Sequence, residues 1–402
     1  MKLTSYFLPV SLIAGNSALS HAASVSRPYS RWMADSMIAH PGAVPATRYY
    51  GEATFYRGIE AVYNATGDSS YRTYLISQMD AILTANGSFR AWDYADHQLD
   101  NIRVGSVLLY LYSLTHEAKY KSAVDFLYDQ LVNKQKRTAS GGFWHKDPKY
   151  PNQMWLDGLF MAEPFYAQYN ALFNASAVAA WDDVLLQFSL VEKHCRNTTT
   201  GMLYHGYDES LKAVWANPVT GASPHVWDRA QGWYLMALVD VLDWFPTSHP
   251  GRAQLVGWLR RLAGALKTAQ DVKSGGWWLV MDAPYPGQKG NYIESSGTAM
   301  YTYGLLKGVR MGYLAEEEKE REEYVGVAER AYRLMVDRFV ARNGTNGTLN
   351  WEGTVRVGSL DGNGDFTYYT TVPVVENSVL GFSPFILASV EMEVRNKTLA
   401  SS

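Results

Sequence analysis

The sequence predicts an all-α fold, an (α/α)6 barrel of six inner and six outer helices with short β segments in its loops. Helical periodicity runs through long segments, among them residues 53–63, 105–114, 227–245 and 254–269. Strand-like alternation is confined to short patches rich in glycine and aromatic residues. A polar or acidic residue followed by small residues recurs at the start of apolar helices, at intervals of about 50 to 80 residues. Each interval has room for an inward helix, a loop and an outward helix.

In chain order, the six inner helices are expected to begin at Tyr50, Asp100, Asp157, Trp227, Glu294 and Glu376. In a closed barrel these polar starts would gather at one end, where the helix dipoles favour an anionic ligand. The alternative is that acidic residues at helix starts are ordinary N-caps, which is the simpler interpretation for any single one of the six.

The amino-acid composition excludes some classes of function and favours others. The chain has 402 residues, 47% of them hydrophobic, and a formal net charge of -3 without a basic run, so nucleic acid is not an expected partner. It contains 13 Trp and 28 Tyr, many in glycine-rich stretches such as residues 274–278. Flat apolar faces beside polar groups suit sugar rings, although a large core also uses aromatic residues.

The first 22 residues have the charged start, short apolar run and small-residue end of a secretory signal peptide. We therefore expect a secreted, extracellular protein in which residues 23–402 form a single catalytic domain. No later stretch approaches the roughly 20 apolar residues of a membrane-spanning helix, so a membrane is not an expected partner.

Glycosylation sequons support export. They begin at Asn64, Asn86, Asn174, Asn197, Asn343, Asn346 and Asn396, so N-glycans are expected. Cys195 is the only cysteine, which excludes an internal disulfide and a thiol metal site. The dispersed histidines His97, His145, His205 and His225 lack metal-ligand spacing, so no zinc or other metal site is predicted.

The densest group of candidate catalytic residues spans 141–161. Asp157 lies between Trp155 and Met161 where an apolar helix is expected to begin, so its carboxyl group would be partly desolvated. Desolvation favours the protonated form that a general acid needs. Asp100 opens the neighbouring inner helix, and as a second carboxylate it would favour that form further.

A second group surrounds Arg229 and Trp233, which are four residues apart and share one helix face. A guanidinium beside an aromatic wall can hold the carboxylate and ring of a uronate. The alternative is a structural arginine paired with Asp228 or Asp240. His145 and His205, taken alone, are more often structural or surface histidines than catalytic ones.

Several motifs in order resemble the signature blocks of glycoside hydrolase family 105, the unsaturated glucuronyl and rhamnogalacturonyl hydrolases. They are residues 144–145 (WH), 153–162 (QMWLDGLFMA), 205–210 (HGYDES), 215–216 (WA), 220–223 (TGAS), 227–234 (WDRAQGWY) and 291–299 (NYIESSGTA). The resemblance covers residues 45–315 well and the C-terminal part weakly.

The resemblance implies an (α/α)6 barrel that removes the terminal 4,5-unsaturated uronic acid from lyase-generated oligosaccharides, with pectin-derived rhamnogalacturonan as the expected source. It implies that Asp157 is the general acid/base and Asp100 the second catalytic aspartate. The implied substrate-binding residues are Tyr50, His145, His205, Trp227, Arg229 and Trp233. Because the bond attacked is a vinyl ether, hydration of its double bond would need neither a nucleophile at the anomeric carbon nor a cofactor.

Two other functions fit the same barrel. An α-mannanase-like glycosidase would rely on adjacent aspartates, and the chain contains Asp182 and Asp183 in an otherwise ordinary amphipathic segment. A secreted, non-catalytic glycan-binding protein is the alternative outside the enzymes.

Overall fold

The computed structural model describes residues 27–40, 42 and 44–401, and the predicted signal peptide lies outside these residues. The inner helices are α2 (Tyr50–Thr66), α4 (Gly105–Thr115), α6 (Leu156–Phe173), α8 (Asp228–Val241), α10 (Ser295–Arg310) and α13 (Val379–Ser401). The outer helices are α1 (Tyr29–Ala39), α3 (Ser69–Ile82), α5 (Ala118–Asp129), α7 (Val178–Cys195), α9 (Arg252–Ala269) and α11 (Glu318–Arg338).

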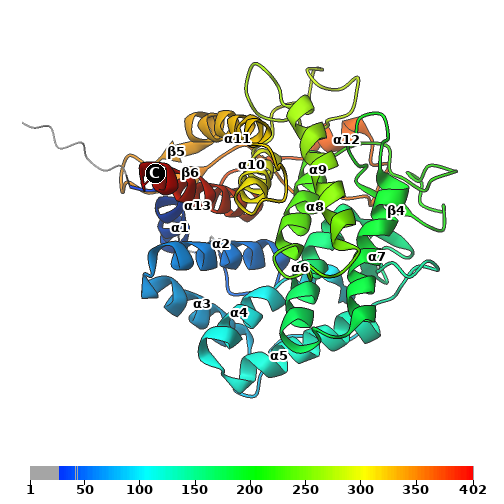
Figure 1. Cartoon of the computed structure of the whole chain (residues 1–402), viewed down its shortest axis with the longest axis vertical. Helices are drawn as coiled ribbons and strands as arrows, with labels where there is room; N and C mark the ends of the chain where they lie inside the picture. Colours follow the sequence, from blue (N-terminus) through cyan, green and yellow to red (C-terminus); the bar gives the residue numbers. More distant parts are fainter. Residues whose placement is uncertain (1–26, 41, 43, 402) are drawn as a thin grey trace, which may run out of the picture.

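The inner helices form a closed ring (Figure 1). Each packs on the next in chain order, and α13 closes the ring against α2. Helices α3, α5, α7, α9 and α11 each pack on the inner helix that they follow, and α1 packs on α2 and α13. The predicted all-α barrel is therefore confirmed.

Close approach of the inner helices depends on glycine. A Cβ atom on Gly105 of α4 would lie 2.3 Å from the ring of Phe165 on α6, and one on Gly232 of α8 would lie 2.4 Å from the sulfur of Met300 on α10. Every residue of α8 is buried. A helix buried on all sides loses the polar face of an amphipathic surface helix.

Short antiparallel strand pairs join the loops. They are β1 (His97–Gln98) with β2 (Lys146–Asp147), β3 (Gln153–Trp155) with β4 (Gly206–Asp208), β5 (Val340–Arg342) with β6 (Leu349–Trp351), and β7 (Thr354–Val355) with β8 (Val374–Val375). The shorter helical elements are the 3₁₀ turn at Leu99–Asn101, the π turn at Gln130–Lys134 and α12 (Phe366–Thr371).

Four predicted helix starts agree with the structure. Tyr50 is the first residue of α2, Asp157 is the second of α6, and Trp227 and Glu294 directly precede α8 and α10. The cap interpretation holds for Glu294, whose Oε2 accepts from the backbone N–H of Gly297 at 2.9 Å.

The other two starts were predicted too early. Asp100 lies in the 3₁₀ turn, and α4 begins at Gly105 after a further turn of the chain. Glu376 precedes α13, which begins at Val379. Asn377 lies between them with φ of 50°, a left-handed conformation that a right-handed helix excludes, so α13 starts only after it.

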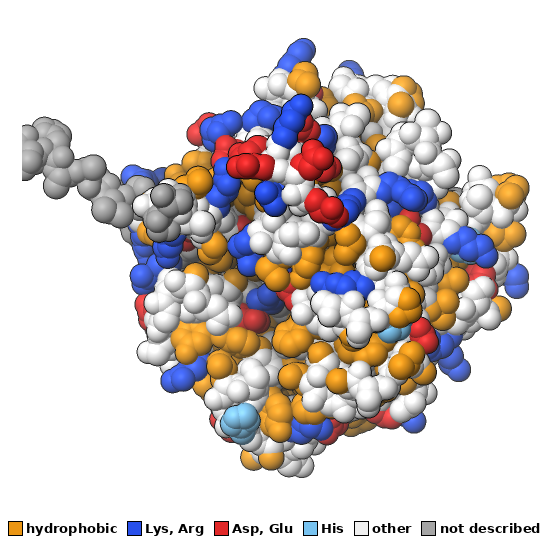
Figure 2. All heavy atoms as spheres, in the orientation of Figure 1, with side chains coloured by type: hydrophobic (Ala, Val, Ile, Leu, Met, Phe, Trp, Pro, Cys, Tyr) orange, Lys and Arg blue, Asp and Glu red, His pale blue; other side chains and the backbone are white. Residues whose placement is uncertain are grey.

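The surface shown in Figure 2 mixes acidic and basic side chains over the region of α11. This mixture is typical of a solvated surface near zero net charge. Among the described residues, no helix combines the length and apolar character needed to cross a bilayer.

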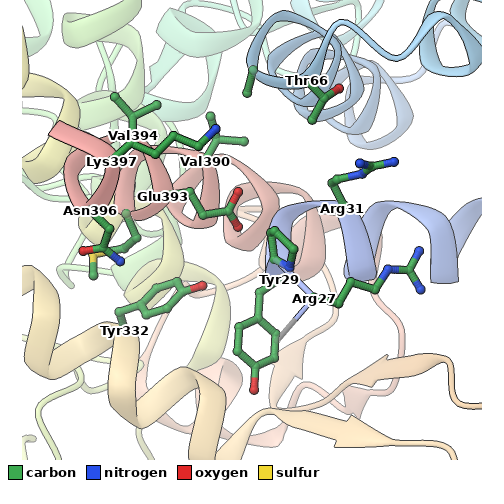
Figure 3. Close-up of a pocket in the computed structure, with 13 residues that line it drawn as sticks. Arg27, Tyr29, Arg31, Thr66, Tyr332, Val390, Glu393, Val394, Asn396 and Lys397 are labelled. Carbon is green, nitrogen blue, oxygen red and sulfur yellow. The ribbon is translucent and has the colours of Figure 1, made fainter. Parts of the chain in front are cut away.

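A cavity of about 660 Å³ lies at the end of the barrel where α2 and α13 finish (Figure 3). Arg31 of α1, Tyr332 of α11 and Glu393 of α13 line it. Glu393 is already bound to Ser30, accepting from its backbone N–H at 3.0 Å and from its hydroxyl at 2.6 Å. None of the residues predicted to act on a substrate lines this cavity.

Candidate active site

The pairing of β3 with β4 brings Asp157 to His205. Trp155 lies opposite Gly206 in this pair, and the backbone N–H of Leu156 donates to the carbonyl of His205 at 3.0 Å. The next residue along is Asp157, whose Oδ2 lies 3.1 Å from Nε2 of His205. His205 is fully buried, whereas the Asp157 side chain keeps 12% of its exposure. One oxygen of the predicted acid therefore contacts His205, while part of its side chain stays accessible.

The pairing of β1 with β2 brings Asp100 to Lys146 and His145. Gln98 lies opposite Lys146, and the N–H of Leu99 donates to the carbonyl of His145 at 3.1 Å. Asp100 consequently has Nζ of Lys146 at 2.6 Å from Oδ2 and Nε2 of His145 at 3.9 Å from Oδ1.

The electrostatics of Asp100 reflect these neighbours. Burial raises the pKa of its carboxyl group, Lys146 lowers it, and the charge of Asp157 raises it. The two predicted catalytic aspartates are thus close enough to interact. Burial lowers the pKa of Lys146, and Asp100 raises it through its charge and its hydrogen bond. The raising effects together are the larger, so the pKa of Lys146 is raised and the ammonium stays charged.

His145 belongs to an aromatic stack. Its ring lies 4.5 Å from that of Trp155 at 22°, and 6.0 Å from that of Tyr150 at 14°. Burial, with help from Lys146, lowers the pKa of His145 well below its usual range, so the imidazole is neutral. Its Nδ1 has no hydrogen-bond partner among the described residues.

The two predicted tryptophans, Trp227 and Trp233, are buried and pack against other aromatic rings. Trp233 stacks on Phe160 at 4.8 Å, and the ring of Tyr50 meets its edge at 6.1 Å. Trp227 lies 4.8 Å from the ring of His205, and its Nε1 has no partner within the described chain. The structure therefore gathers these residues with Asp157 at the end of the barrel where the inner helices start.

The guanidinium of Arg229 donates hydrogen bonds to other groups of the protein. Its Nε donates to Ser296 Oγ at 2.9 Å, Nη1 donates to the carbonyl of Arg356 at 3.0 Å, and Nη2 donates to the carbonyl of Val355. Glu294 Oε1 lies 3.7 Å from Nη2. These contacts occupy three of the five N–H groups of a guanidinium. The prediction that Arg229 grips a uronate is not tested by this geometry and stays a prediction.

The two acids considered as structural partners of Arg229 have other neighbours. Asp240 accepts from Nζ of Lys307 at 2.6 Å. Asp228 is fully buried against Gly297, where an added Cβ would lie 2.4 Å from Oδ2. Burial and then the charge of Glu294 raise the pKa of Asp228 well above its usual range.

Two residues at this site were not predicted. Lys146 adjoins His145 in sequence, so a cation beside the predicted aspartates was in principle detectable. Tyr369 had no local signal, because α12 reaches the site only through the tertiary fold. Its hydroxyl lies 2.7 Å from Nδ1 of His205, and its ring stacks on Trp227 at 5.8 Å and 24°.

The adjacent aspartates of the mannanase alternative lie on the outer helix α7. Asp183 is held by Arg137, with Nη1 at 2.7 Å and Nη2 at 2.8 Å, and accepts from Tyr166 at 3.1 Å. Asp182 is exposed and lies 3.3 Å from Nε2 of His249. Neither belongs to the cluster around Asp157.

No group of three or more His, Cys, Asp or Glu side chains in the described part of the chain is arranged to hold a metal ion. That the reaction needs no metal or cofactor remains a prediction.

Comparison with known proteins decides the family. Residues 26–396 match the family model of Glycosyl Hydrolase Family 88. The structure of a family 105 glycoside hydrolase from C. acetobutylicum ATCC 824 is similar with a TM-score of 0.85 and 37% identity, over 92% of this chain and all of that one. The chain belongs to the glycosyl hydrolases of families 88 and 105. The predicted family resemblance is confirmed, and the protein is a glycoside hydrolase.

More distant relatives extend the comparison. An unsaturated 3S-rhamnoglycuronyl hydrolase from Alteromonas sp. is 20% identical over 89% of this chain and 81% of its own length. The structure of an α-1,6-mannanase from Salegentibacter sp. is 11% identical with a TM-score of 0.61, over 91% of this chain and 98% of that one. The second likeness shows a shared barrel and nothing about the reaction.

Proposed function

We propose that this glycoside hydrolase removes the terminal 4,5-unsaturated uronic acid from oligosaccharides produced by a polysaccharide lyase. Membership of families 88 and 105 supports this class of substrate. The named activity of the Alteromonas relative points the same way.

One observation favours hydration over ordinary glycosidic displacement. Displacement needs two carboxyl groups that both face the scissile bond. Here Asp157 keeps an exposed edge, whereas the Asp100 side chain is almost wholly buried and lies 2.6 Å from Lys146. A single accessible acid suits protonation of a double bond, which requires no second carboxylate as nucleophile.

In the proposed reaction, Asp157 donates its proton to C4 of the double bond and positive charge develops at C5. Water adds at C5, and the Asp157 carboxylate accepts the proton that the water loses, so the acid is regenerated. The product is a hemiketal at C5. Its ring C5–O bond breaks to give a ketone, and the hemiacetal left at C1 releases the leaving sugar.

Unpartnered polar atoms around Asp157 support binding of a hydroxyl-rich ligand. Nδ1 of His145 and Nε1 of Trp227 are buried and have no hydrogen-bond partner among the described residues. Such atoms are costly to bury unless a partner reaches them. Sugar hydroxyl groups can act as donor to the first and acceptor to the second.

The test is the loss of ultraviolet absorbance that accompanies saturation of the conjugated double bond. We propose rhamnogalacturonan as the parent polysaccharide, so its lyase-generated disaccharide should be the best substrate in a panel that includes ulvan and glycosaminoglycan products. A disaccharide with a saturated uronate serves as control. Release of reducing sugar from α-1,6-mannan without absorbance loss would support the mannanase alternative, and binding without turnover would support the glycan-binding alternative.

We further propose that the protein is secreted after cleavage near residue 22, carries N-glycans, and folds as the single domain 23–402. Asn86 and Asn346 are exposed and lie in turns, so these two sequons are suited to carry a glycan. Expression in a eukaryotic secretory host, followed by N-terminal sequencing and mass measurement before and after enzymatic deglycosylation, tests secretion, cleavage and glycosylation. An intact residue 1 on protein from the medium, or an unchanged mass, would contradict it.

A further inference from the structure

Asp157, His205 and Tyr369 form a buried chain of hydrogen bonds. Tyr369 Oη lies 2.7 Å from His205 Nδ1, and His205 Nε2 lies 3.1 Å from Asp157 Oδ2. Tyr369 is 1% exposed and His205 is fully buried. Each imidazole nitrogen therefore has one partner, and the proton on the ring can occupy either nitrogen.

The hydroxyl of Tyr369 decides between these tautomers. It has no hydrogen-bond partner other than His205 in the described residues. If Nδ1 carried the proton, the hydroxyl hydrogen would be buried without an acceptor, which is unfavourable. If the hydroxyl donates to Nδ1, the ring proton lies on Nε2 and is donated to Asp157. Both hydrogens are then used.

We propose that Tyr369 is a positioning residue that fixes the Nε2–H tautomer of His205 and thereby reserves Oδ1 of Asp157 for the proton transferred to substrate. Oδ2 accepts from His205 whether Asp157 is protonated or ionised, so the transferable proton resides on the other oxygen. This inference rests on the proposed hydration reaction. With the opposite tautomer, Nε2 would accept the proton of Asp157 and hold it away from the double bond.

The surroundings of Tyr369 hold it in place for this role. The N-terminus of α12 is capped by Asp365, whose Oδ1 accepts from the N–H of Tyr368 at 2.7 Å. Phe366 stacks on Tyr285 at 4.4 Å. Burial raises the pKa of Tyr369 well above its usual range, so its hydroxyl keeps the hydrogen at all working pH values.

The matched pair of variants is Tyr369→Phe and Tyr368→Phe. Both remove one hydroxyl from α12, but Tyr368 uses its oxygen to accept from the N–H of Ser359 at 2.7 Å, not to contact His205. For Tyr369→Phe we expect kcat to fall roughly tenfold or more. KM should be nearly unchanged, because the Tyr369 hydroxyl is buried against His205 and is not exposed to a bound ligand. Tyr368→Phe should keep kcat within about twofold of wild type.

Nitrogen-15 spectra of the histidine side chains test the tautomer without substrate, with His205→Gln used to assign the His205 resonances. We expect a protonated Nε2 and an acceptor Nδ1 in wild type, and loss of this single tautomer in Tyr369→Phe. A protonated Nδ1 in wild type, or equal kcat losses in the two phenylalanine variants, would overturn the proposal. If wild type fails to hydrate any unsaturated uronide, the proposed function fails, and the spectra still decide the tautomer.

Discussion

The ammonium of Lys146 lies 2.6 Å from Oδ2 of Asp100 and is the main influence that offsets the burial of this carboxyl group. The two residues meet because Lys146 pairs with Gln98 in the short β1–β2 ladder. The ladder thus places beside Asp100 the cation that lowers the pKa of this second predicted catalytic aspartate.

Replacing Lys146 should change the pH profile. In Lys146→Gln the influence that lowers the pKa of Asp100 is gone, so burial raises this pKa further. If the reaction needs Asp100 as a carboxylate, the acid limb of kcat/KM moves to higher pH. Lys149→Gln is the control, because Lys149 is exposed and pairs with Asp361 at 2.9 Å. An acid limb at the same pH in both variants would mean that Asp100 does not act as a charged group.

Asp157→Asn should keep the fold and lose turnover by about 100-fold or more, because an amide preserves shape but cannot transfer a proton. The thermal unfolding midpoint and substrate binding should stay close to wild type. Asp182→Asn is the control on the outer helix and should retain full activity. Activity that survives in the first variant and disappears in the second would favour the mannanase alternative.

Arg229→Lys tests both roles considered for this side chain. The single nitrogen of an ammonium cannot replace the three guanidinium nitrogens that reach Ser296 and the two backbone carbonyls, so we expect a loss of roughly 1–3 kcal/mol in the free energy of unfolding. If Arg229 also grips the uronate, KM rises as well, with kcat little changed.

The matched control is Arg137→Lys, which breaks the bidentate hydrogen bond with Asp183. It should lower stability without changing KM. A KM for Arg229→Lys equal to that of the control would restrict Arg229 to a structural role. A methyl-esterified substrate should be poor for wild type in the uronate-binding case.

Glu163 makes stability depend on pH. Its carboxyl group is buried in α6, Oε2 has no partner among the described residues, and burial raises its pKa well above the usual range. Because the folded-state pKa exceeds the unfolded one, the folded state binds the extra proton, and stability decreases as pH rises from about 4.5 toward the folded-state pKa. Glu163→Gln should therefore unfold at a higher temperature than wild type at pH 8 and at a similar one at pH 4.

Glu192→Gln is the control, since Glu192 accepts from Arg196 Nε at 2.8 Å and the substitution removes this charged contact, which should lower the unfolding temperature. Thermal unfolding of the three proteins across this pH range checks the sign. A Glu163→Gln advantage that is independent of pH would show that titration is not its cause.

The sequence by itself determined the fold class and predicted most residues of the candidate site. Helical periodicity and the recurring polar helix starts depend on residues close together in the chain, so they can be read without the fold. The motif that contains Asp157 also lies within one short segment, and a residue between two apolar neighbours at a helix start already indicates a partly desolvated acid. The predicted helix starts were less accurate where an unusual backbone conformation delays the helix, as the left-handed Asn377 does before α13.

Only the tertiary structure decided which atoms meet. Tyr369 is 164 residues from His205 in the chain, and their contact depends on the return of the C-terminal segment over the barrel end. No local pattern encodes such a contact. The same holds for Arg229, whose sequence neighbours suggested an ion pair with Asp228 or Asp240, whereas the fold supplies Ser296 and two backbone carbonyls. Hydrogen bonds act over about 3 Å, so their partners are fixed by packing between distant segments and not by spacing along the chain.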